Sequence, residues 1–308
     1  MLSVDDLSTT YQHGGRTIRA VDGVSLSLAA GETLGLVGES GCGKSTLGKA
    51  VLRLLPSAGG QVRFDGTDIT RLTGRALQPF RRRMQMVFQD PASALNPRQT
   101  TGTLLAVPLM VHGIRSRTER RRRVEAMMDR VGLPRSALTR YPHEFSGGQK
   151  QRIGIARALV LQPELLICDE PVSALDVSIQ AQILNLLVDI KQQERLSYLF
   201  ISHDLGVVRY IADRVAVMYL GRIVETAPQE SLWNRPAHPY TRALIDAVPG
   251  KGHGRPAPIA GDLPDPADVP QGCRFHQRCP MATAICRTTP PAWREVAPGH
   301  HAACHHAA

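Results

Sequence analysis

A glycine-rich run near the amino terminus has the residue types that bind phosphate. Its sequence from Gly38 to Ser45 fits the pattern G-x-x-x-x-G-K-[ST] in full. Glycines let backbone N–H groups curl around a phosphate, and the start of a following helix adds positive partial charge. We expect Lys44 to reach the β- and γ-phosphates of a nucleotide and the Ser45 hydroxyl to bind Mg²⁺. The predicted nucleotide-binding residues of this run are Gly38, Glu39, Ser40, Gly41, Cys42, Gly43, Lys44, Ser45 and Thr46.

Two acidic residues follow an apolar run later in the chain. Residues 165–168 are all apolar, which is typical of a buried parallel strand, and Asp169 and Glu170 come directly after them. Ligands of open α/β sheets bind at the carboxyl ends of the strands. We therefore expect Asp169 to hold the Mg²⁺ and Glu170 to orient or deprotonate an attacking water.

A second run has the composition of an anion site. Ser146, Gly147, Gly148 and Gln149 precede a helical pattern, so their backbone N–H groups can bind a second phosphate. Phosphoryl transfer depends on positioning and on charge neutralisation more than on covalent chemistry. One chain thus contains two phosphate-binding elements together with the acids that such a reaction needs.

Strands and helices alternate along most of the chain, and they must position these residues. Strands are predicted at 2–8, 24–37, 61–65, 84–88, 165–168, 198–202, 214–218 and 222–226. Helices are predicted at 45–55, 100–112, 117–131, 149–161 and 177–194. The alternation predicts an α/β fold with a largely parallel sheet and an inserted helical subdomain at about 90–162. Residues 250–270 are rich in Pro, Gly and Asp, which is typical of a linker or an irregular wrap.

Residues 146–149 closely resemble the signature sequence of ABC ATPases, and the glycine-rich run fits the same family. The resemblance implies an ABC nucleotide-binding domain at 1–235, of α/β class, with the helical subdomain inserted. A small irregular extension that contains cysteines is expected at 236–308. The family forms a head-to-tail dimer in which each ATP is held by the P-loop of one subunit and the signature of the other.

Further positions match those of the family one by one. Tyr11 matches the aromatic residue that stacks on adenine. Gln89 matches the glutamine that contacts Mg²⁺ and water and links to the membrane subunit. Asp176 ends a segment similar to the loop that crosses the dimer interface, and His203 matches the histidine that contacts the γ-phosphate. The resemblance implies an active ATPase with Glu170, His203 and Gln89 as catalytic residues and with Ser45, Gln89 and Asp169 around Mg²⁺.

Three segments, 141–145, 170–182 and 238–241, are similar to the ATPase subunits of oligopeptide and dipeptide importers, and most of all to the second ATPase of the pair. The resemblance implies a heterodimer with a related ATPase, two transmembrane permease subunits and an extracytoplasmic substrate-binding protein. It places the chain on the cytoplasmic face of the membrane and implies no nucleic acid. The cargo stays open, because the same branch transports nickel chelates and glutathione.

Four of the six cysteines crowd into the end of the chain, namely Cys273, Cys279, Cys286 and Cys304. Their intervals lack the tight C-x₂₋₄-C pair of most zinc sites and fit neither common ferredoxin spacing. The peptide-importer branch has a motif similar to residues 272–280, and some members hold a [4Fe–4S] cluster there. The resemblance implies such a cluster, with zinc and metal-free thiols as alternatives. We expect a structural or sensory role, because the segment lies far beyond His203.

The composition argues against a membrane-spanning or a secreted protein. No run approaches the roughly 18 apolar residues of a membrane helix, and the first residues are no secretory signal, so we expect a cytosolic chain.

The charge of the chain raises the question of nucleic-acid binding. The net charge is +10, but aromatic residues make up only 5% and none interleaves with the arginine clusters, which weakens a nucleic-acid interpretation. The alternatives are a soluble ABC ATPase acting on nucleic acid or in iron–sulfur assembly. Members of the first kind carry two P-loops or a long coiled coil, which this chain lacks.

Overall fold

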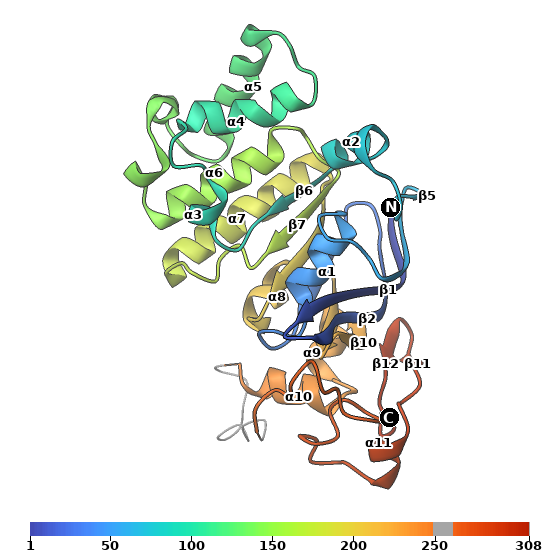
Figure 1. Ribbon diagram of the computed structural model, residues 1–308. Helices are drawn as coiled ribbons and strands as arrows, with labels where there is room; N and C mark the ends of the chain where they lie inside the picture. Colours follow the sequence, from blue (N-terminus) through green and yellow to red (C-terminus); the bar gives the residue numbers. More distant parts are fainter. Residues whose placement is uncertain (249–260, 308) are drawn as a thin grey trace. The chain divides into compact units, whose positions relative to one another are not determined.

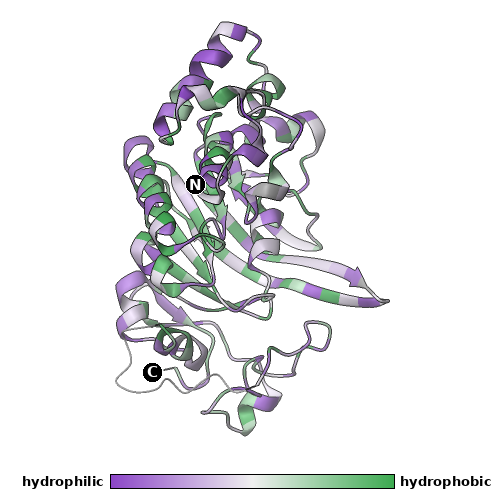
Figure 2. Cartoon of the chain, turned by 90° about the vertical axis from the view of Figure 1, so that its left-hand side faces the viewer, coloured by the Kyte–Doolittle hydropathy of each residue, from purple (hydrophilic) through white to green (hydrophobic). Residues whose placement is uncertain are grey.

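The computed structural model describes residues 1–248 and 261–307. The chain divides into two compact units. The first comprises Met1–Arg71 and Phe200–Ala308, and the second comprises Leu72–Leu199. Within each unit, hydrophobic residues recur along the strands and on one side of the helices (Figure 2). The described part of the predicted linker, 261–270, contains neither helix nor strand, and the rest of it lies outside the described residues.

The amino-terminal part of the first unit is an antiparallel sheet with the strand order β2-β1-β4-β5 (Figure 1). Its strands are β1 (Leu2–His13), β2 (Arg16–Leu28), β4 (Gly59–Phe64) and β5 (Thr67–Asp68). Leu2 pairs with Leu28 on one side and with Phe64 on the other, and all three side chains are buried. Helix α1 (Lys44–Val51) contacts both β1 and β2, so this sheet flanks the helix that follows the glycine-rich run.

The first unit also contains strands of a larger sheet. Every residue of β3 (Thr33–Val37) is buried, as expected for a parallel strand covered on both faces. Strand β3 pairs in parallel with β9 (Arg214–Tyr219), which pairs antiparallel with β10 (Arg222–Pro228). Strand β8 (Ser197–Ser202) is buried throughout and enters this unit at Phe200. The buried strand β3 ends where the phosphate-binding run begins.

One predicted strand is divided in the structure. The sequence predicts a single strand over 24–37, whereas β2 ends at Leu28 and β3 begins at Thr33. Between them the Glu32 carboxylate accepts a hydrogen bond from the Ala29 N–H at 2.7 Å, and Gly31 adopts a φ of 75°. This turn allows the chain to leave the antiparallel sheet and enter the larger one. Apolar periodicity continues across the turn and conceals it.

The second unit combines a helical cluster with two parallel strands. Its helices are α2 (Gly74–Arg83), α3 (Pro91–Ala94), α4 (Thr101–Val111), α5 (Arg117–Arg130), η1 (Arg135–Thr139), η2 (Pro142–Glu144), α6 (Gly147–Leu159) and α7 (Val177–Glu194). Strands β6 (Met84–Val87) and β7 (Leu165–Asp169) pair in parallel. Helices α4, α5 and α6 contact one another around buried residues such as Leu105, Met128 and Ile153. The apolar stripes in the sequence therefore correspond to the faces that these helices bury.

The carboxy-terminal extension adds strands to the larger sheet of the first unit. Strand β12 (His300–Ala302) pairs with β10, and β11 (Arg294–Ala297) pairs with β12. The extension and the segment before it also contain α8 (Leu205–Ile211), α9 (Gln229–Asn234), α10 (Pro239–Asp246) and α11 (Ala284–Thr288). In the part of the chain that the structure describes, no helix is long and apolar enough to cross a membrane.

Candidate active site

The glycine-rich run connects β3 to α1 and takes a path that only glycine permits at two positions. Gly43 has a φ of 109°, and a Cβ there would lie 2.0 Å from the Ala20 carbonyl oxygen. Gly38 has a φ of 153°, and a Cβ there would lie 2.2 Å from the Met218 carbonyl oxygen. The loop is thus pressed against the backbone of two neighbouring strands. A loop of this kind before a helix can present backbone N–H groups to an anion.

Lys44 lies folded over this loop. Its Nζ donates hydrogen bonds to the carbonyl oxygens of Gly38 and Glu39, both at 2.8 Å, and its side chain is buried. The Cys42 Sγ lies 3.8 Å from the same Nζ. Burial raises the pKa of the Cys42 thiol, so this thiol stays neutral and unreactive. The lysine ammonium is therefore held close to the loop that the sequence predicts to bind phosphate.

Tyr11 and Thr46 meet at the edge of this region. The Tyr11 Oη lies 3.3 Å from the Thr46 Oγ1, within hydrogen-bonding distance, and 39% of Tyr11 is exposed. The structure therefore brings the predicted adenine-stacking residue to the end of the predicted phosphate loop. His203, exposed, follows β8 in the same unit, directly before Asp204, which caps α8 by accepting hydrogen bonds from the Gly206 and Val207 N–H groups.

The predicted acids lie in the second unit at the end of β7. Asp169 is the last residue of this strand and is buried. Glu170 has a φ of 46°, an uncommon value for a residue with a side chain. The Gln89 Nε2 donates a hydrogen bond to the Glu170 Oε2 at 3.1 Å. Two residues that are 81 positions apart, and that the sequence predicts to act on the same water, are thus in contact.

The signature run forms the amino terminus of α6. The Ser146 side chain accepts a hydrogen bond from the Gln149 N–H, and the Gln149 side chain accepts one from the Ser146 N–H. This reciprocal capping box fixes where the helix begins. A Cβ on Gly148 would lie 2.6 Å from the Ile179 Cγ2 of α7, so the two helices approach closely there. Asp176, exposed, is the residue before α7.

Two residues that the sequence did not assign to the site contact the phosphate loop. The Tyr240 Oη accepts a hydrogen bond from the Glu39 N–H at 2.8 Å. The Arg278 guanidinium donates two hydrogen bonds to the Glu39 carboxylate, at 2.7 and 2.9 Å. Both residues lie in segments similar to the importer branch, 238–241 and 272–280, but no periodicity or motif indicates that they reach back to Glu39.

The extension cysteines share one small region. The Cys273 N–H donates to the Cys286 carbonyl oxygen at 2.9 Å. The His306 Nε2 lies 3.5 Å from the Cys286 Sγ, and the His306 N–H donates to the Cys304 Sγ. Burial, with smaller contributions from Cys286, Cys304 and Cys279, raises the pKa of Cys273 to about 11, although a backbone hydrogen bond from Phe275 opposes the shift. The four thiols are therefore near enough to one another to interact electrostatically.

These thiols do not surround a single point. Within residues 1–248 and 261–307, no group of three or more His, Cys, Asp or Glu side chains is arranged to hold a metal ion. A tetrahedral zinc site needs all its sulfurs at about 2.3 Å from one ion. A [4Fe–4S] cluster differs, because each of four irons takes one thiolate. The four cysteines of this region match the cluster in donor type and number.

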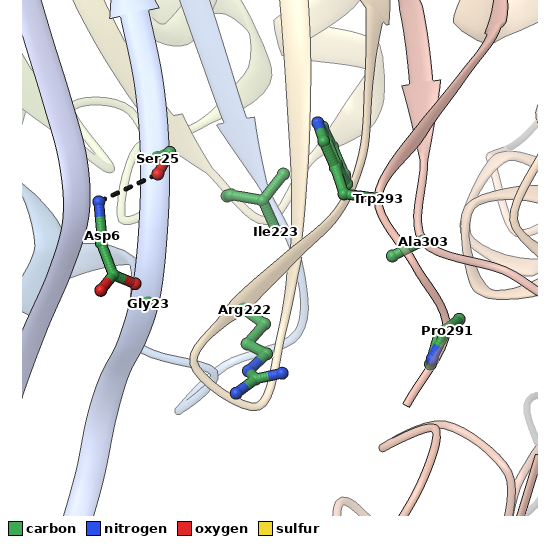
Figure 3. A pocket seen from close by; sticks show the side chains of 8 residues that line it. All are labelled: Asp6, Gly23, Ser25, Arg222, Ile223, Pro291, Trp293 and Ala303. Atoms are coloured by element: carbon green, nitrogen blue, oxygen red, sulfur yellow. Dashed lines mark hydrogen bonds between the residues drawn. The ribbon is translucent and has the colours of Figure 1, made fainter. Parts of the chain in front are cut away.

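A separate pocket with a volume of about 350 Å³ lies in the first unit (Figure 3). It is lined by Asp6, Gly23, Ser25, Arg222, Ile223, Pro291, Trp293 and Ala303. The lining residues come from β1, β2, β10 and the extension, and the Asp6 N–H donates to the Ser25 Oγ at 2.9 Å. None of these residues belongs to the set predicted from the sequence. The extension thus has a surface shared with the amino-terminal sheet, apart from the phosphate loop.

Comparisons with known families match both parts of the chain. A family described as "ABC transporter" matches residues 21–173. A family described as "Oligopeptide/dipeptide transporter, C-terminal region" matches residues 224–286. The first match spans the phosphate loop and the signature, and the second spans Tyr240 and three of the four extension cysteines.

Individual relatives extend over nearly the whole chain. The chain is 53% identical to a protein of Brucella ovis named as a peptide import ATP-binding protein, over 99% of this chain and 97% of that protein. It is 52% identical to the oligopeptide transport ATP-binding protein AppF of Bacillus subtilis, over 97% of this chain and 92% of that one. Among solved structures, the dimeric ATP-binding cassette MJ0796 bound to ADP and Pi has a TM-score of 0.69 at 29% identity, covering 74% of this chain and 99% of the cassette.

Proposed function

This chain belongs to the ABC transporter family, in the branch of peptide import ATP-binding proteins, and from that premise we propose which of its residues bind and hydrolyse ATP. The chain is the ATP-hydrolysing subunit of a peptide importer, and its hydrolysis is coupled to transport. The observation that carries this function is the extent of the likeness, which includes both the cassette and the transporter-specific region at 224–286.

ATP binding is assigned to the phosphate loop and its neighbours. Lys44 lies beside the loop carbonyl groups, so its ammonium can transfer to the β- and γ-phosphates when these arrive. Backbone N–H groups at the start of α1 are proposed to supply further donors, whereas the Glu39 N–H is already hydrogen-bonded to Tyr240. Tyr11, at the Thr46 end of the loop, is proposed to stack on adenine. Its position 3.3 Å from Thr46 supports this role.

Hydrolysis is assigned to Glu170 with Gln89 and His203. The Gln89 hydrogen bond fixes the orientation of the Glu170 carboxylate, which supports a role for Glu170 in accepting a proton from water. His203 is proposed to contact the γ-phosphate. Ser45, Gln89 and Asp169 are the residues that would hold Mg²⁺, which neutralises charge on the phosphates when bound.

The signature run is proposed to act on an ATP held by another subunit. Ser146, Gly147, Gly148 and Gln149 begin a helix of 13 residues, and a helix amino terminus favours a phosphate. The solved cassette with which this chain shares its fold is a dimer. We propose a head-to-tail heterodimer with a related ATPase, in which Asp176 lies at the interface between subunits.

The remaining partners follow from the names of the relatives. A protein that imports peptides needs subunits that span the membrane, and no described helix of this chain can do so. We propose two permease subunits, an extracytoplasmic peptide-binding protein, and a location at the cytoplasmic face of the membrane. Gln89, which is exposed, is proposed to link to a permease subunit.

The cysteines of the extension are proposed to bind a [4Fe–4S] cluster. The four cysteines lie in one region of the extension, where hydrogen bonds from backbone N–H groups join Cys273 to Cys286 and His306 to Cys304, and this grouping is what supports the assignment. The cluster would fix the segments around Cys273, Cys279, Cys286 and Cys304 relative to one another. Metal binding of this kind stabilises small regions that have little core of their own.

The assignment of Glu170 is tested by Glu170→Gln in the assembled importer. We expect ATP to bind with unchanged affinity and turnover to fall by about 10²-fold or more, because glutamine cannot accept the proton. The matched control is Glu164→Gln, which alters an exposed acid that pairs with Arg83 before the start of β7. Turnover of Glu170→Gln within about threefold of wild type would remove Glu170 from the role of base.

A further inference from the structure

Glu39 of the phosphate loop has partners both within the loop and in the region beyond residue 235. Three groups hold it: Tyr240 at its N–H, Arg278 at its carboxylate and Lys44 at its carbonyl oxygen. Lys44 is the residue assigned to the β- and γ-phosphates. Tyr240 and Arg278 both come from the region beyond residue 235. The conformation of Glu39 is thus determined jointly by the phosphate-binding lysine and by the extension.

The contact between Arg278 and Glu39 has the features of an ion pair that fixes geometry. Only 7% of the Arg278 side chain and 26% of the Glu39 side chain are exposed. The guanidinium binds both carboxylate oxygens in a fork, a geometry that lysine cannot reproduce. Because such a pair is largely removed from water, the loss of one partner leaves the other charge uncompensated.

The position of Arg278 is itself set by the fold of the extension. Its N–H donates to the Phe275 carbonyl oxygen at 3.0 Å, and the Phe275 ring packs against Tyr219 and Tyr240. Arg278 also lies over the Tyr219 ring. Tyr219 is the last residue of β9, the strand beside β3. An aromatic cluster therefore joins the extension to the sheet directly beneath the phosphate loop.

We propose that Arg278 is a positioning residue of the ATP site. Through its fork on Glu39 it holds the phosphate loop, and with it the carbonyl groups that Lys44 contacts, in the path that accepts the phosphates. Through Arg278 the extension is therefore a part of the ATP-binding apparatus, and the contact between Arg278 and Glu39 contributes to the affinity for MgATP. This inference rests on the proposed ATP site at 38–46 and does not require a metal centre in the extension.

The test is MgATP binding by the full chain, measured with a fluorescent ATP analogue, in Arg278→Gln and in a matched control. The control is Arg274→Gln, because Arg274 lies in the same loop of the extension and pairs with Asp22 of β2 instead of Glu39. We expect Arg278→Gln to raise the Kd by about tenfold and Arg274→Gln to leave it within about twofold, although both lower the thermal midpoint. Arg278→Lys, which keeps the charge without the fork, should recover part of the affinity.

Turnover of the assembled importer gives a second readout. We expect Arg278→Gln to raise KM for ATP and to leave kcat within about threefold, because a positioning defect acts on binding more than on the chemical step. The double variant combines Arg278→Gln with Glu39→Gln. Its effect on Kd should be much smaller than the sum of the two single effects, because each single variant removes the same contact between Arg278 and Glu39. If Arg278→Gln acted only by loosening the fold in general, Arg274→Gln would change KM and Kd for ATP by as much as Arg278→Gln does.

The outcomes separate this inference from the function on which it rests. If the wild-type chain does not bind MgATP, the proposed ATP site is wrong. If the wild type binds and Arg278→Gln has a Kd within about twofold of it, or no higher than that of Arg274→Gln, the positioning role is overturned. Should Arg278→Gln not fold, Glu39→Gln replaces it in the same comparison, and an unchanged Kd for that variant also overturns the role.

Discussion

Cys42 and Gly43 are adjacent in the phosphate loop but tolerate very different changes. The Cys42 side chain is buried, and its Sγ makes one long contact with Lys44. We expect Cys42→Ala to keep the Kd for MgATP within about twofold of wild type. We expect Gly43→Ala to abolish measurable binding, because its Cβ would lie 2.0 Å from the Ala20 carbonyl oxygen at a φ of 109°.

Both variants are measured by nucleotide titration, with circular dichroism as the control for folding. A Gly43→Ala protein that binds MgATP normally would show that the loop path is not the one described. A large loss in Cys42→Ala would give the thiol a role beyond filling space.

At the scale of residues, the sequence predicts those site residues whose role follows from residue type and from spacing within a motif. Gln89 and Glu170 are predicted from two separate segments, and in the structure the Gln89 Nε2 lies 3.1 Å from the Glu170 Oε2. Tyr240 and Arg278 were not predicted as part of the site. Their contact with Glu39 depends on the path of the chain over more than 200 positions, and no local pattern encodes that path.

The amino terminus of helix α10 contains a titrating cap. The His238 Nδ1 accepts a hydrogen bond from the Tyr240 N–H at 3.1 Å, so the ring must stay neutral there. Burial lowers the pKa of His238 to about 4, although the nearby Glu225 carboxylate opposes this shift. In the unfolded chain His238 has an ordinary histidine pKa near 6.5. Between pH 6.5 and pH 4 the unfolded chain therefore binds a proton at His238 that the folded chain does not bind.

Acidification should consequently destabilise the fold around α10. The stabilisation is fully present above about pH 6.5 and is lost as the pH falls towards 4, at about 1.4 kcal/mol per pH unit. Between pH 7.5 and pH 5.5 both proteins should lose some free energy of unfolding. We expect this loss to be about 1.4 kcal/mol smaller in His238→Asn than in wild type. Asparagine is a good cap that does not titrate. Urea unfolding at the two pH values checks this, and equal losses in both proteins would contradict it.

At the scale of elements, boundaries are predictable where a side chain encodes them. Thr100, Ser116 and Ser146 each accept a hydrogen bond from the N–H three residues later and begin α4, α5 and α6. The break between β2 and β3 was not predicted, because the apolar pattern continues through it. The strands of the extension were not predicted either. They are short, and the pairing of β12 with β10 joins residues about 75 positions apart.

At the scale of the whole molecule, the proposed ATP site needs two chains. The phosphate loop and the signature run are both present, and the family uses them across an interface. We expect the isolated chain to hydrolyse ATP slowly and to gain specific activity when the partner ATPase and permeases are added. Specific activity is measured over a dilution series. Activity that stays at the level of the complex in a dilute monomer would contradict a site shared between subunits.

The proposed cluster gives the chain a second measurable component. Protein purified without oxygen should carry about four irons and four acid-labile sulfides per chain and should absorb visible light. Cys279→Ser combined with Cys286→Ser should lose the iron, whereas Cys42→Ala should keep it, because Cys42 lies in the phosphate loop. If the purified protein contains zinc and no acid-labile sulfide, the proposed cluster is wrong. If it contains no metal, the four cysteines are ordinary thiols.

The fold class and the ATPase family were predictable because they depend on local motifs and on the alternation of strands and helices. The role of the region beyond residue 235 was harder to predict from the sequence. Its residues carry little periodicity, and the sequence predicts a structural or sensory role for a segment that lies far beyond His203. Arg278 and Tyr240 nevertheless reach Glu39, which only the tertiary structure reveals.

The buried carboxylate of Glu225 has a consequence for the order in which the protein is made. Glu225 has no exposed surface and accepts hydrogen bonds from the Ala237 and His238 N–H groups, and its Oε1 lies 2.7 Å from the His300 Nε2. His300 leaves the ribosome 75 residues after Glu225. Until then β10 has an open edge and an acid without its full set of partners. The nascent cassette therefore stays incomplete during translation, and the edge of β10 is covered only when β12 emerges.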